Sequence, residues 1–552
     1  MEYRLPAEQN QSEFWKRCVE RNSMRKIYLL DCTLRDGGYI NDWRFGRETI
    51  KGFCKKIART GIEILEVGFI KRDTYDPDQS LFPDVQSFTD MIQPKSENMM
   101  YVGMLDMSAP IPLDRLVPCD GSSLDGIRVI FKKEKIEEAY IYCKRIMELG
   151  YKLFVNFVGT DLYTDKEFIE GIQKFNTLHP FALSIVDSFG LIKRKHFLRL
   201  VYLADNNLAP GIILAYHAHN NLQQAFGNAE ALVEMNLKRD LCIDACVFGM
   251  GRGAGNLNLE LFAEYMNESY DTQYRIEPML EIMDEYLNDI YKRKQWGYSL
   301  PLYLSASTGC HPNYAIYLAE KDSLPVKAFN ELLRSIPVEE KAKFSKDKAE
   351  RYYRQYQENY IDDKDTLQSL AEQMEGKKVL LLAPGSSIGK YKDAIEEVAN
   401  KDDVIVWAVN FTGGVFNVDY VFSSNMRRYR NIQGKTDAKC ITTSNMRECE
   451  HTDFVVNFAS YALDEPEIID NSGLMALRLL KAIGVKEVII AGMDGYSAYS
   501  TGDYYDSTLS YDFSKEAEKR NTLISQEIKK AQGTMKIGFI TPTNYQVSEE
   551  LM

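Results

Sequence analysis

The sequence predicts an α/β protein with two parts: an N-terminal (β/α)8 TIM barrel with a helical extension, and a C-terminal doubly wound, Rossmann-like domain. A chain of 552 residues is too long for one ordinary core and indicates two to three domains. Eight strand-like apolar runs lie within about 225 residues near the N-terminus, nearly all separated by amphipathic segments. A second series of apolar runs begins at Lys377, after a highly charged stretch.

The barrel prediction rests on the spacing of the eight runs, because eight β/α units are what a closed barrel requires. We expect a lead-in at 1–25, the barrel at 26–265, a helical extension and linker at 266–365, and the Rossmann-like domain at 366–552. The eight runs are Ile27–Asp31, Ile62–Gly68, Met99–Leu105, Gly126–Phe131, Leu153–Val158, Leu183–Asp187, Ile212–Tyr216 and Cys242–Phe248.

The composition is that of a globular protein, with 45% hydrophobic and 27% charged residues. The net charge of −13 argues against non-specific nucleic-acid binding, which needs a basic surface. No apolar run approaches the ~20 residues of a membrane span, and the first 25 residues have no apolar segment typical of a signal peptide. The ten cysteines are scattered without a CxxC pair, so we expect reduced thiols in a cytoplasmic protein.

Charged side chains follow the ends of several predicted barrel strands, where the active site of such a barrel lies. Arg35 and Asp36 follow the first run, Glu66 lies at the end of the second, and Asp187 ends the sixth. We therefore expect these side chains to meet on one rim of the barrel.

Two histidines end the seventh run, in the sequence Tyr216-His-Ala-His-Asn-Asn. His217 and His219 are two residues apart on a strand, so they point the same way and can share a metal ion. The alternative is that they are core histidines with satisfied hydrogen bonds. For a same-face pair at a strand end, joined by the Asp36 carboxylate and the Asn256 amide oxygen, ligand chemistry favours a divalent metal site.

A glycine-rich loop, Gly249-Met-Gly-Arg-Gly-Ala-Gly-Asn256, follows the last run. It loosely matches GxGxxG, which by itself is weak evidence for a dinucleotide. Because it follows the last strand of a barrel, close approach of the backbone to a metal-bound substrate is the better interpretation, with Gly253 as a candidate substrate contact.

Five motifs occur in order over roughly residues 25 to 265: Thr33-Leu-Arg-Asp-Gly-Gly, Glu66-Val-Gly-Phe, Asp187-Ser-Phe-Gly, His217-Ala-His-Asn-Asn and Gly251-Arg-Gly-Ala-Gly-Asn. In these motifs the chain resembles the metal-dependent pyruvate-aldolase and acyl-lyase superfamily. Its members include isopropylmalate synthase, hydroxymethylglutaryl-CoA lyase and the 4-hydroxy-2-oxovalerate aldolases, which this chain resembles most.

The resemblance implies that Asp36, His217 and His219 are metal ligands, with Asn256 as a further ligand. It also implies that Arg35 contacts the oxo or enolate oxygen of the substrate. Mn²⁺ or Mg²⁺ is the expected ion, and Co²⁺ or Zn²⁺ would also suit these ligands. The candidate substrate-binding residues are Arg35, Glu66, Asp187, Asn221 and Gly253; Glu66 and Asp187 are also expected to hold the ligands in place.

One position departs from the family pattern. The aldolases carry a catalytic histidine three residues after the metal aspartate, and this chain has Tyr39 there. Tyrosine is a poor base at neutral pH because its unperturbed pKa is about 10. Within Gly309-Cys-His-Pro-Asn-Tyr314, His311 or Tyr314 is a candidate replacement, although His311 could equally cap or pack a helix start.

The second series of runs predicts an open parallel sheet, in which ligands bind beyond the carboxyl ends of strands. A small-residue turn follows its first strand, and a helix start there could hold a phosphate. The alternative is an ordinary tight turn, with Arg427 and Arg428 on a solvated face. The candidate nucleotide-binding residues are Gly385, Ser386, Ser387, Asn410, Asn425 and Asp494.

The resemblance therefore implies a metal-dependent carbon–carbon lyase that makes or breaks an aldol of pyruvate or another 2-oxo acid. The alternatives are a Claisen-type acyl-CoA transferase or lyase of the same superfamily, and a metal-binding protein that has lost catalysis. The expected partners are a 2-oxo acid, an aldehyde and, in the second domain, a nucleotide or nucleotide sugar, which would suit surface-sugar metabolism. We also expect a homo-oligomer.

Overall fold

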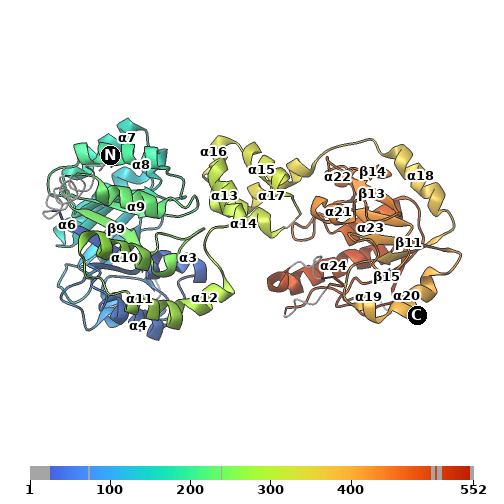
Figure 1. The fold of residues 1–552 in the computed structure, drawn as a ribbon, viewed down its shortest axis with the longest axis horizontal. Coiled ribbons are helices and arrows are strands. Elements are labelled where there is room, and N and C mark those ends of the chain that lie inside the picture. Colours follow the sequence, from blue (N-terminus) through green and yellow to red (C-terminus); the bar gives the residue numbers. More distant parts are fainter. Residues whose placement is uncertain are drawn as a thin grey trace, which may run out of the picture. The chain divides into compact units, whose positions relative to one another are not determined.

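The computed structural model describes residues 25–71, 75–237, 239–321, 323–498, 504–506 and 512–547. The chain divides into two compact units, Met1–Pro312 and Asn313–Met552. Each unit contains one parallel sheet (Figure 1). In the described part of the chain, no helix combines the length and the apolar character that crossing a bilayer requires.

The first unit is a closed barrel of eight parallel strands, as the sequence predicts. The strands lie in the order β1-β9-β8-β7-β6-β5-β4-β2, and β1 pairs with β2 to close the ring; the short strand β3 (Leu81–Phe82) pairs with the outer end of β2. The barrel strands are β1 (Ile27–Asp31), β2 (Ile64–Ile70), β4 (Met100–Asp106), β5 (Gly126–Phe131), β6 (Lys152–Phe157), β7 (Ala182–Asp187), β8 (Ile213–Ala218) and β9 (Leu241–Ala245).

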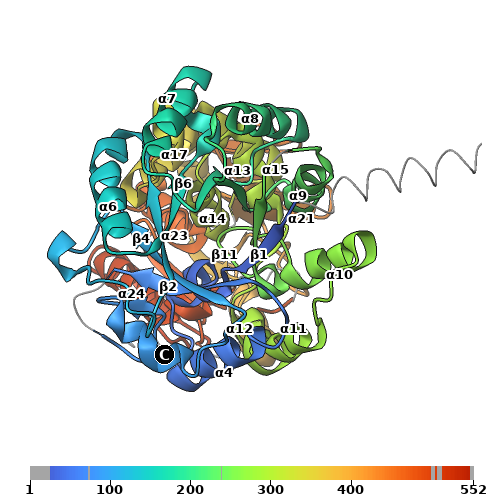
Figure 2. The ribbon, with the colours of Figure 1, turned by 90° about the vertical axis from the view of Figure 1, so that its left-hand side faces the viewer.

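Amphipathic helices connect the strands and surround them, as Figure 2 shows. The longer ones are α4 (Arg47–Ile57), α6 (Ile136–Glu148), α7 (Asp165–Asn176), α8 (Arg194–Asn207), α9 (Ala225–Glu234) and α10 (Leu259–Tyr270). After the barrel, α11 (Glu277–Ile282), a π-helical turn (Met283–Leu287), α12 (Asn288–Arg293) and α13 (Leu300–Thr308) form the helical extension of this unit.

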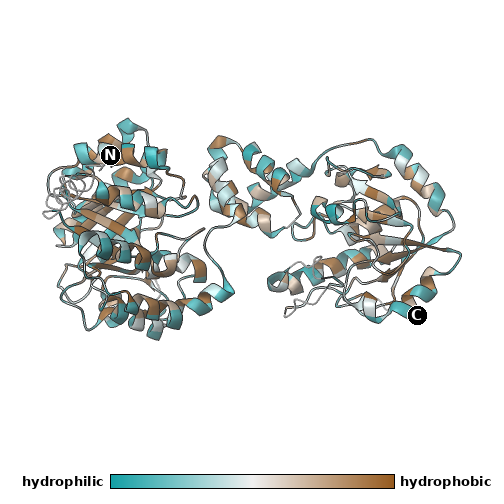
Figure 3. Cartoon of the chain, in the orientation of Figure 1, coloured by the Kyte–Doolittle hydropathy of each residue, from teal (hydrophilic) through white to brown (hydrophobic). Residues whose placement is uncertain are grey.

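Alternation along the strands separates two cores. The outward residues of β9, such as Leu241 and Ile243, belong to the large core beneath the helices, whereas Cys242 and Cys246 face the barrel interior. Figure 3 shows the apolar strands inside and the polar outer faces of the helices. By the same alternation Asp244 points inward, so the strand pattern itself places a carboxylate in the barrel.

Several strand limits differ from the sequence prediction by one or more residues, and two of these differences lie at the candidate site. β8 continues through His217 to Ala218, so His217 is a strand residue. β9 ends at Ala245, before the predicted limit of Phe248, because the chain turns there: Val247–Gly249 is a 3-10 turn in which Phe248 has a φ of 59°. This turn starts the glycine-rich loop close to the barrel axis.

The second unit is built on a seven-stranded parallel sheet in the order β14-β13-β12-β11-β10-β15-β16, which confirms the predicted second α/β domain. One apolar core includes residues of α18, α23 and α24, and a separate core on the other side of the sheet includes residues of α19, α20 and α21. Helices therefore cover both faces, as in a doubly wound fold.

Helices connect most strands of this sheet, but β12 follows β11 and β14 follows β13 with no helix between them. The strands are β10 (Lys378–Leu382), β11 (Val404–Val409), β12 (Tyr420–Ser423), β13 (Lys439–Thr443), β14 (Phe454–Val456), β15 (Glu487–Ala491) and β16 (Lys536–Phe539). The helices are α18 (Lys364–Met374), α19 (Ser387–Lys390), α20 (Lys392–Ala399), α21 (Met426–Ile432), α22 (Phe458–Tyr461), α23 (Ser472–Ala482) and α24 (Ala517–Gln532).

Before α18, the chain forms α14 (Pro312–Glu320), α15 (Val326–Ser335), α16 (Val338–Lys341) and α17 (Lys346–Gln357). The highly charged stretch at 341–365, which its composition predicts to be a solvated helix or linker, contains α17. One face of this helix is buried. Tyr353 is fully buried and donates its hydroxyl to Asp470, 2.7 Å away. Although its sequence is highly charged, α17 therefore packs one face, which carries tyrosine, against the rest of the unit.

Helix α6 offers a matched test of the barrel core. Ile146 is fully buried, whereas Ile141 on the same helix is 57% exposed. We expect Ile146→Ala to lower the free energy of unfolding by about 2–5 kcal/mol, because it removes buried methyl groups and leaves a cavity. Ile141→Ala should change it by less than about 0.5 kcal/mol. Urea unfolding curves of both variants check this, and equal shifts would contradict the assigned packing.

Candidate active site

Three candidate metal ligands meet at the carboxyl ends of the barrel strands. Asp36 ends α2 (Thr33–Asp36), the short helix that follows β1, while His217 and His219 come from the end of β8. All three are buried, and each offers a ligand atom within 4.8 Å of the others. Asp36 Oδ1 lies 4.0 Å from His217 Nε2, and Asp36 Oδ2 lies 3.8 Å from His219 Nδ1.

Asn256 joins this group through backbone and side chain. It pairs with His219 in an antiparallel bridge, and its Nδ2 donates to Asp36 Oδ2 at 2.6 Å. In this orientation the amide nitrogen, and not the oxygen, lies beside the carboxylate. A half-turn of the amide would exchange the two atoms, so Asn256 can act as an oxygen ligand only after that turn.

A series of buried ion pairs fixes the group from below. Arg35 bonds to Asp36 at 2.5 Å through Nη1 and to Glu66 at 2.7 Å through Nε. Glu66 also lies 3.2 Å from Arg128, and Arg128 pairs in turn with Asp244. Burial alone would raise the pKa of Asp36, but Arg35 and the two imidazoles outweigh it, so the pKa lies below its ordinary value.

These residues fit a divalent cation on three grounds. First, the ion-pair series has three carboxylates and two guanidinium groups, which leaves one negative charge in a buried place. Second, His219 Nδ1 and Asn256 Oδ1 are buried and have no hydrogen-bond partner among the described residues. Third, burial lowers the pKa of His219 to about 4, so its ring is neutral at pH 7, as a metal ligand must be.

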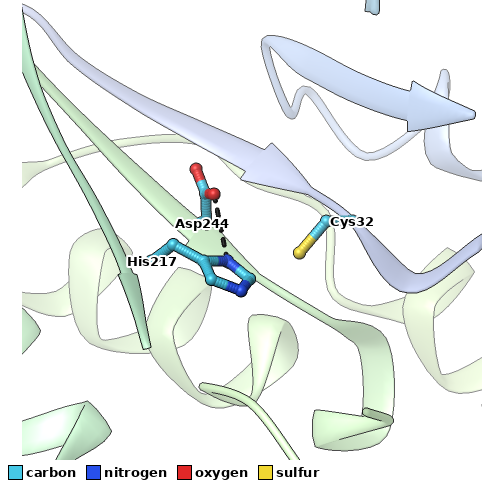
Figure 4. Close-up of side chains that lie close together, drawn as sticks. All are labelled: Cys32, His217 and Asp244. Carbon is cyan, nitrogen blue, oxygen red and sulfur yellow. Dashed lines mark ion pairs between the residues drawn. The ribbon is translucent and has the colours of Figure 1, made fainter. Parts of the chain in front are cut away.

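Asp244 decides which nitrogen of His217 is available. Figure 4 shows the Asp244 carboxylate beside Nδ1 of His217, and the two atoms are 3.1 Å apart. Nε2 is therefore the nitrogen that faces Asp36. A carboxylate that holds the far nitrogen of a histidine in this way is typical of metal sites, because it fixes the ring and its tautomer.

A second group could hold a metal by proximity alone: Cys32, His217 and Asp244 (Figure 4). In this group His217 would have to use Nδ1, the nitrogen beside Asp244. Asp244 is already paired with Arg128, and burial raises the pKa of the Cys32 thiol well above its usual value, which disfavours the thiolate. The Asp36 group is the better candidate.

The glycine-rich loop packs directly on the candidate ligands. A Cβ atom at Gly251 would lie 2.2 Å from Asn256 Nδ2 and 2.8 Å from Asp36 Oδ2, so no side chain fits there. At Gly253, where φ is +67°, a Cβ atom would lie 2.8 Å from Asn221 Oδ1. The loop needs glycine because its backbone touches the ligand residues themselves.

Asp187 and Asn221 hold loops at the same rim. Both carboxylate oxygens of Asp187 accept backbone N–H groups of its own loop, from Leu191 at 2.8 Å and Ile192 at 2.9 Å. Asn221 donates to the carbonyl of Phe189 and accepts from the backbone of Ala254 at 2.8 Å. These bonds commit both side chains to positioning the rim.

Tyr39 and His311 are joined by Arg252, a residue that the sequence reasoning did not single out. The Arg252 guanidinium lies over the Tyr39 ring at 5.6 Å, and its Nη2 is 2.5 Å from His311 Nε2. Although Tyr39 is 36% exposed, desolvation of its hydroxyl and the Asp36 carboxylate raise its pKa to about 12, and burial and Arg252 lower the pKa of His311 to about 3. At neutral pH the tyrosine is therefore a proton donor and the imidazole is neutral.

Tyr314 belongs to the second compact unit. It is fully buried, packs against Phe344 and donates its hydroxyl to the carbonyl of Lys343 at 3.1 Å. We therefore leave it out of the proposed chemistry.

The predicted nucleotide-binding residues lie at the carboxyl ends of the second sheet. Gly385, Asn410, Asn425 and Asp494 line one cleft there. Ser386 and Ser387 do not line it. Ser387 instead donates its backbone N–H to Asp494 at 2.8 Å and its hydroxyl at 2.5 Å, so this pair fixes the turn after β10.

Comparison with known proteins shows what part of the barrel is similar to. The family model described as HMGL-like matches residues 132–284, from the end of β5 to the helical extension. This confirms the superfamily and the class of carbon–carbon lyases that the rim motifs predict.

Among similar proteins is a 4-hydroxy-2-oxovalerate aldolase of Desulfitobacterium hafniense, 22% identical over 282 residues, which are 49% of this chain and 80% of that protein. The Moorella thermoacetica protein of the same name is 22% identical over 55% of this chain and 89% of its own length. Among solved structures, the N-terminal domain of a Bacteroides vulgatus protein described as an aldolase has 23% identity and a TM-score of 0.45, covering 53% of this chain and 96% of that one.

The two candidate metal groups can be separated by substitution. We expect Asp244→Asn to weaken Mn²⁺ binding by about 10–100-fold, because the ring of His217 loses the carboxylate that orients it. Cys32→Ser should change the affinity by less than about threefold, since a hydroxyl fills the same space beside a nitrogen that does not ligate. Titration calorimetry with Mn²⁺ measures both. A large loss in Cys32→Ser would place the metal in the other group.

Proposed function

We propose that the barrel is a divalent-metal-dependent aldolase that makes or breaks an aldol of pyruvate or another 2-oxo acid. The observation that carries the proposal is the buried Asp36, His217 and His219 group, held by the ion pairs of Arg35, Glu66, Arg128 and Asp244. An aspartate, two imidazoles and an amide suit Mn²⁺ or Mg²⁺, with Co²⁺ or Zn²⁺ as alternatives. The named relatives support a 4-hydroxy-2-oxovalerate type of aldol.

When bound, the cation supplies Lewis-acid stabilisation of the charge that develops on an enolate. Arg35 adds a fixed positive charge at the same place. Its Nε and Nη1 are committed to Glu66 and Asp36, so Nη2 is the nitrogen left to donate to an enolate oxygen. Because both partners of Arg35 are buried, its position is set before the substrate arrives.

Tyr39, Arg252 and His311 handle the proton of the aldol hydroxyl. In the direction of cleavage a base takes this proton as the carbon–carbon bond breaks; in the direction of synthesis a donor returns it to the aldehyde oxygen. Neutral His311 can accept a proton once Arg252 turns from its Nε2 to the substrate, and Tyr39 can donate one. The Tyr39–Arg252–His311 series thus takes the place of the histidine that the similar aldolases have.

A Claisen-type reaction of an acyl-CoA is the alternative within the superfamily, and it would use the same metal group. A protein that binds metal without catalysis is the third possibility, which the tyrosine at position 39 favours. We rank the aldolase first because the ligands, Arg35 and their ion-pair partners are all in place.

The proposal extends to the second unit, whose cleft supports a nucleotide or nucleotide-sugar ligand. An aldolase joined to such a domain would suit the assembly of a surface sugar. We also propose that the protein is a homo-oligomer.

Exchange of the pyruvate methyl protons in deuterated water tests the enolate chemistry. We expect NMR to show exchange with Mg²⁺ or Mn²⁺ that a chelator abolishes. Asp36→Asn should lose both metal binding and exchange. Asp42→Asn is the matched control, because Asp42 is an exposed acid a few residues away. Its backbone is left-handed, a conformation that asparagine also adopts. An Asp36→Asn protein that exchanges protons without metal would overturn the proposal.

Cleavage of 4-hydroxy-2-oxovalerate to pyruvate and acetaldehyde tests the proton donor and base. We expect Tyr39→Phe to slow cleavage or synthesis by about 10²–10⁴-fold, the usual contribution of acid–base catalysis. Metal affinity should stay the same, because Tyr39 is not a ligand. The pyruvate formed is measured over time with the wild-type protein and with Tyr39→Phe. Unchanged rates in Tyr39→Phe would remove Tyr39 from the mechanism. A wild-type protein that binds metal but turns over no 2-oxo acid would support the third possibility, a metal-binding protein that has lost catalysis.

A further inference from the structure

The cleft of the second unit lies at the point where the strand order of the sheet reverses. β10 has β11 on one side and β15 on the other, and the chain builds β11 to β14 outward before it returns to β15. In parallel α/β sheets this reversal opens a crevice beyond the strand ends, and ligands bind there. The cleft has a cavity volume of about 140 Å³ and is open to solvent on one side.

Two glycines form the floor of this cleft. Gly385, after β10, donates its N–H to the carbonyl of Gly492, after β15, at 3.0 Å. A Cβ atom at Gly385 would lie 2.3 Å from that carbonyl oxygen, and one at Gly492 would lie 2.1 Å from the carbonyl of Ala383. The two strand ends are therefore in backbone contact, and the space above them stays open.

One wall of the cleft suits an anion. Arg428 lines it and is only 6% exposed, and α21, which carries it, is capped by Asn425. Asn471, Ser472 and Gly473, at the start of the eleven-residue helix α23, line the same cleft.

A hydroxyl contact holds these two elements together, because Ser472 Oγ lies 2.5 Å from Ser424 Oγ, one residue before Asn425. An arginine fork beside a helix N-terminus favours a phosphate.

Three aromatic side chains of the same cleft suit a planar ring. Tyr496, Phe513 and Tyr545 line the cleft on the side of β15 and β16. The rings of Tyr496 and Phe513 meet edge to face with centroids 5.1 Å apart, and the Arg520 guanidinium lies over Phe513 at 3.8 Å. Aromatic and guanidinium planes of this kind stack well on a nucleobase.

Two carboxylates also line the cleft. Asp470 lines the cleft while one of its oxygens accepts the Tyr353 hydroxyl, and Glu467 lines it while paired with Lys346 and Lys519. A carboxylate oxygen accepts hydrogen bonds from sugar hydroxyls but repels a second anion. The part of the cleft beside these carboxylates therefore suits a neutral part of the ligand that carries hydroxyl groups.

From this arrangement we propose that the cleft binds a nucleoside phosphate, with its phosphate at Arg428 and the start of α23 and its base against Tyr496, Phe513 and Tyr545. The assignment rests on the nucleotide ligand proposed for the second unit and adds where each part of that ligand binds. The turn at residues 385–387 takes no part, because Asp494 holds Ser387.

Titration calorimetry on the full chain tests the assignment with four kinds of probe: the common nucleoside monophosphates, the diphosphates, the matching nucleosides, and inorganic phosphate. We expect at least one nucleotide to bind at least about tenfold more tightly than its nucleoside and than phosphate alone, since one charge-assisted contact contributes about this factor. A nucleoside that binds as tightly as its nucleotide would overturn the phosphate position. If none of the nucleotides binds, the proposal that the second unit has a nucleotide ligand is wrong.

Variants of one helix locate the phosphate. Arg428→Gln should weaken nucleotide binding at least about tenfold and leave nucleoside binding within about twofold. Arg427→Gln, an exposed neighbour on α21, should change neither. Arg428→Lys keeps the positive charge and serves as the control for a folding defect at this position. It should bind the nucleotide with intermediate affinity. Phe513→Leu should weaken nucleotide and nucleoside alike. Normal nucleotide binding by a folded Arg428→Gln protein would refute the assignment, whatever the barrel's activity.

Discussion

The ion-pair series in the barrel interior is the constraint on which the candidate site depends. Removing charges from water is costly, and a buried ion pair repays that cost only when each charge keeps its partners. Arg35 and Arg128 each bridge two carboxylates, and Glu66 lies between them. Loss of any one partner would leave an uncompensated charge in the interior. Asp36 and His217 are therefore positioned by residues from three strands and from α2.

The same series explains why the barrel tolerates polar side chains among apolar ones. The lower interior is filled by residues such as Leu30, Ile64 and Phe154, which pack without polar atoms. One layer above them, the inward positions of β2, β5 and β9 are Glu66, Arg128 and Asp244. The barrel thus changes from an apolar core to a charged layer, and the candidate metal group lies above that layer.

Strand periodicity and the rim motifs were enough to predict the barrel, the second sheet and the Asp36, His217 and His219 group. They could not predict Arg128 or Asp244 as parts of the site, because each is a single polar residue in an apolar strand and their contact joins positions 116 residues apart. Arg252 was hidden in a glycine-rich motif, and its link to His311 depends on where the helical extension places that ring. The early end of β9 depends on the backbone of Phe248, which no pattern of hydrophobicity encodes.

The order of the strands around the barrel also determines the stage of protein synthesis at which the candidate site can form. β1 pairs with β9, the last barrel strand, so the first strand has both neighbours only after the whole barrel sequence is available. Asp36 follows the first strand, the two histidines end the seventh, and Asn256 follows the eighth. A chain still on the ribosome therefore has no complete ligand set until residue 256 has left the exit tunnel. Until then the candidate metal group is incomplete, so closure of the barrel and assembly of this group are one event.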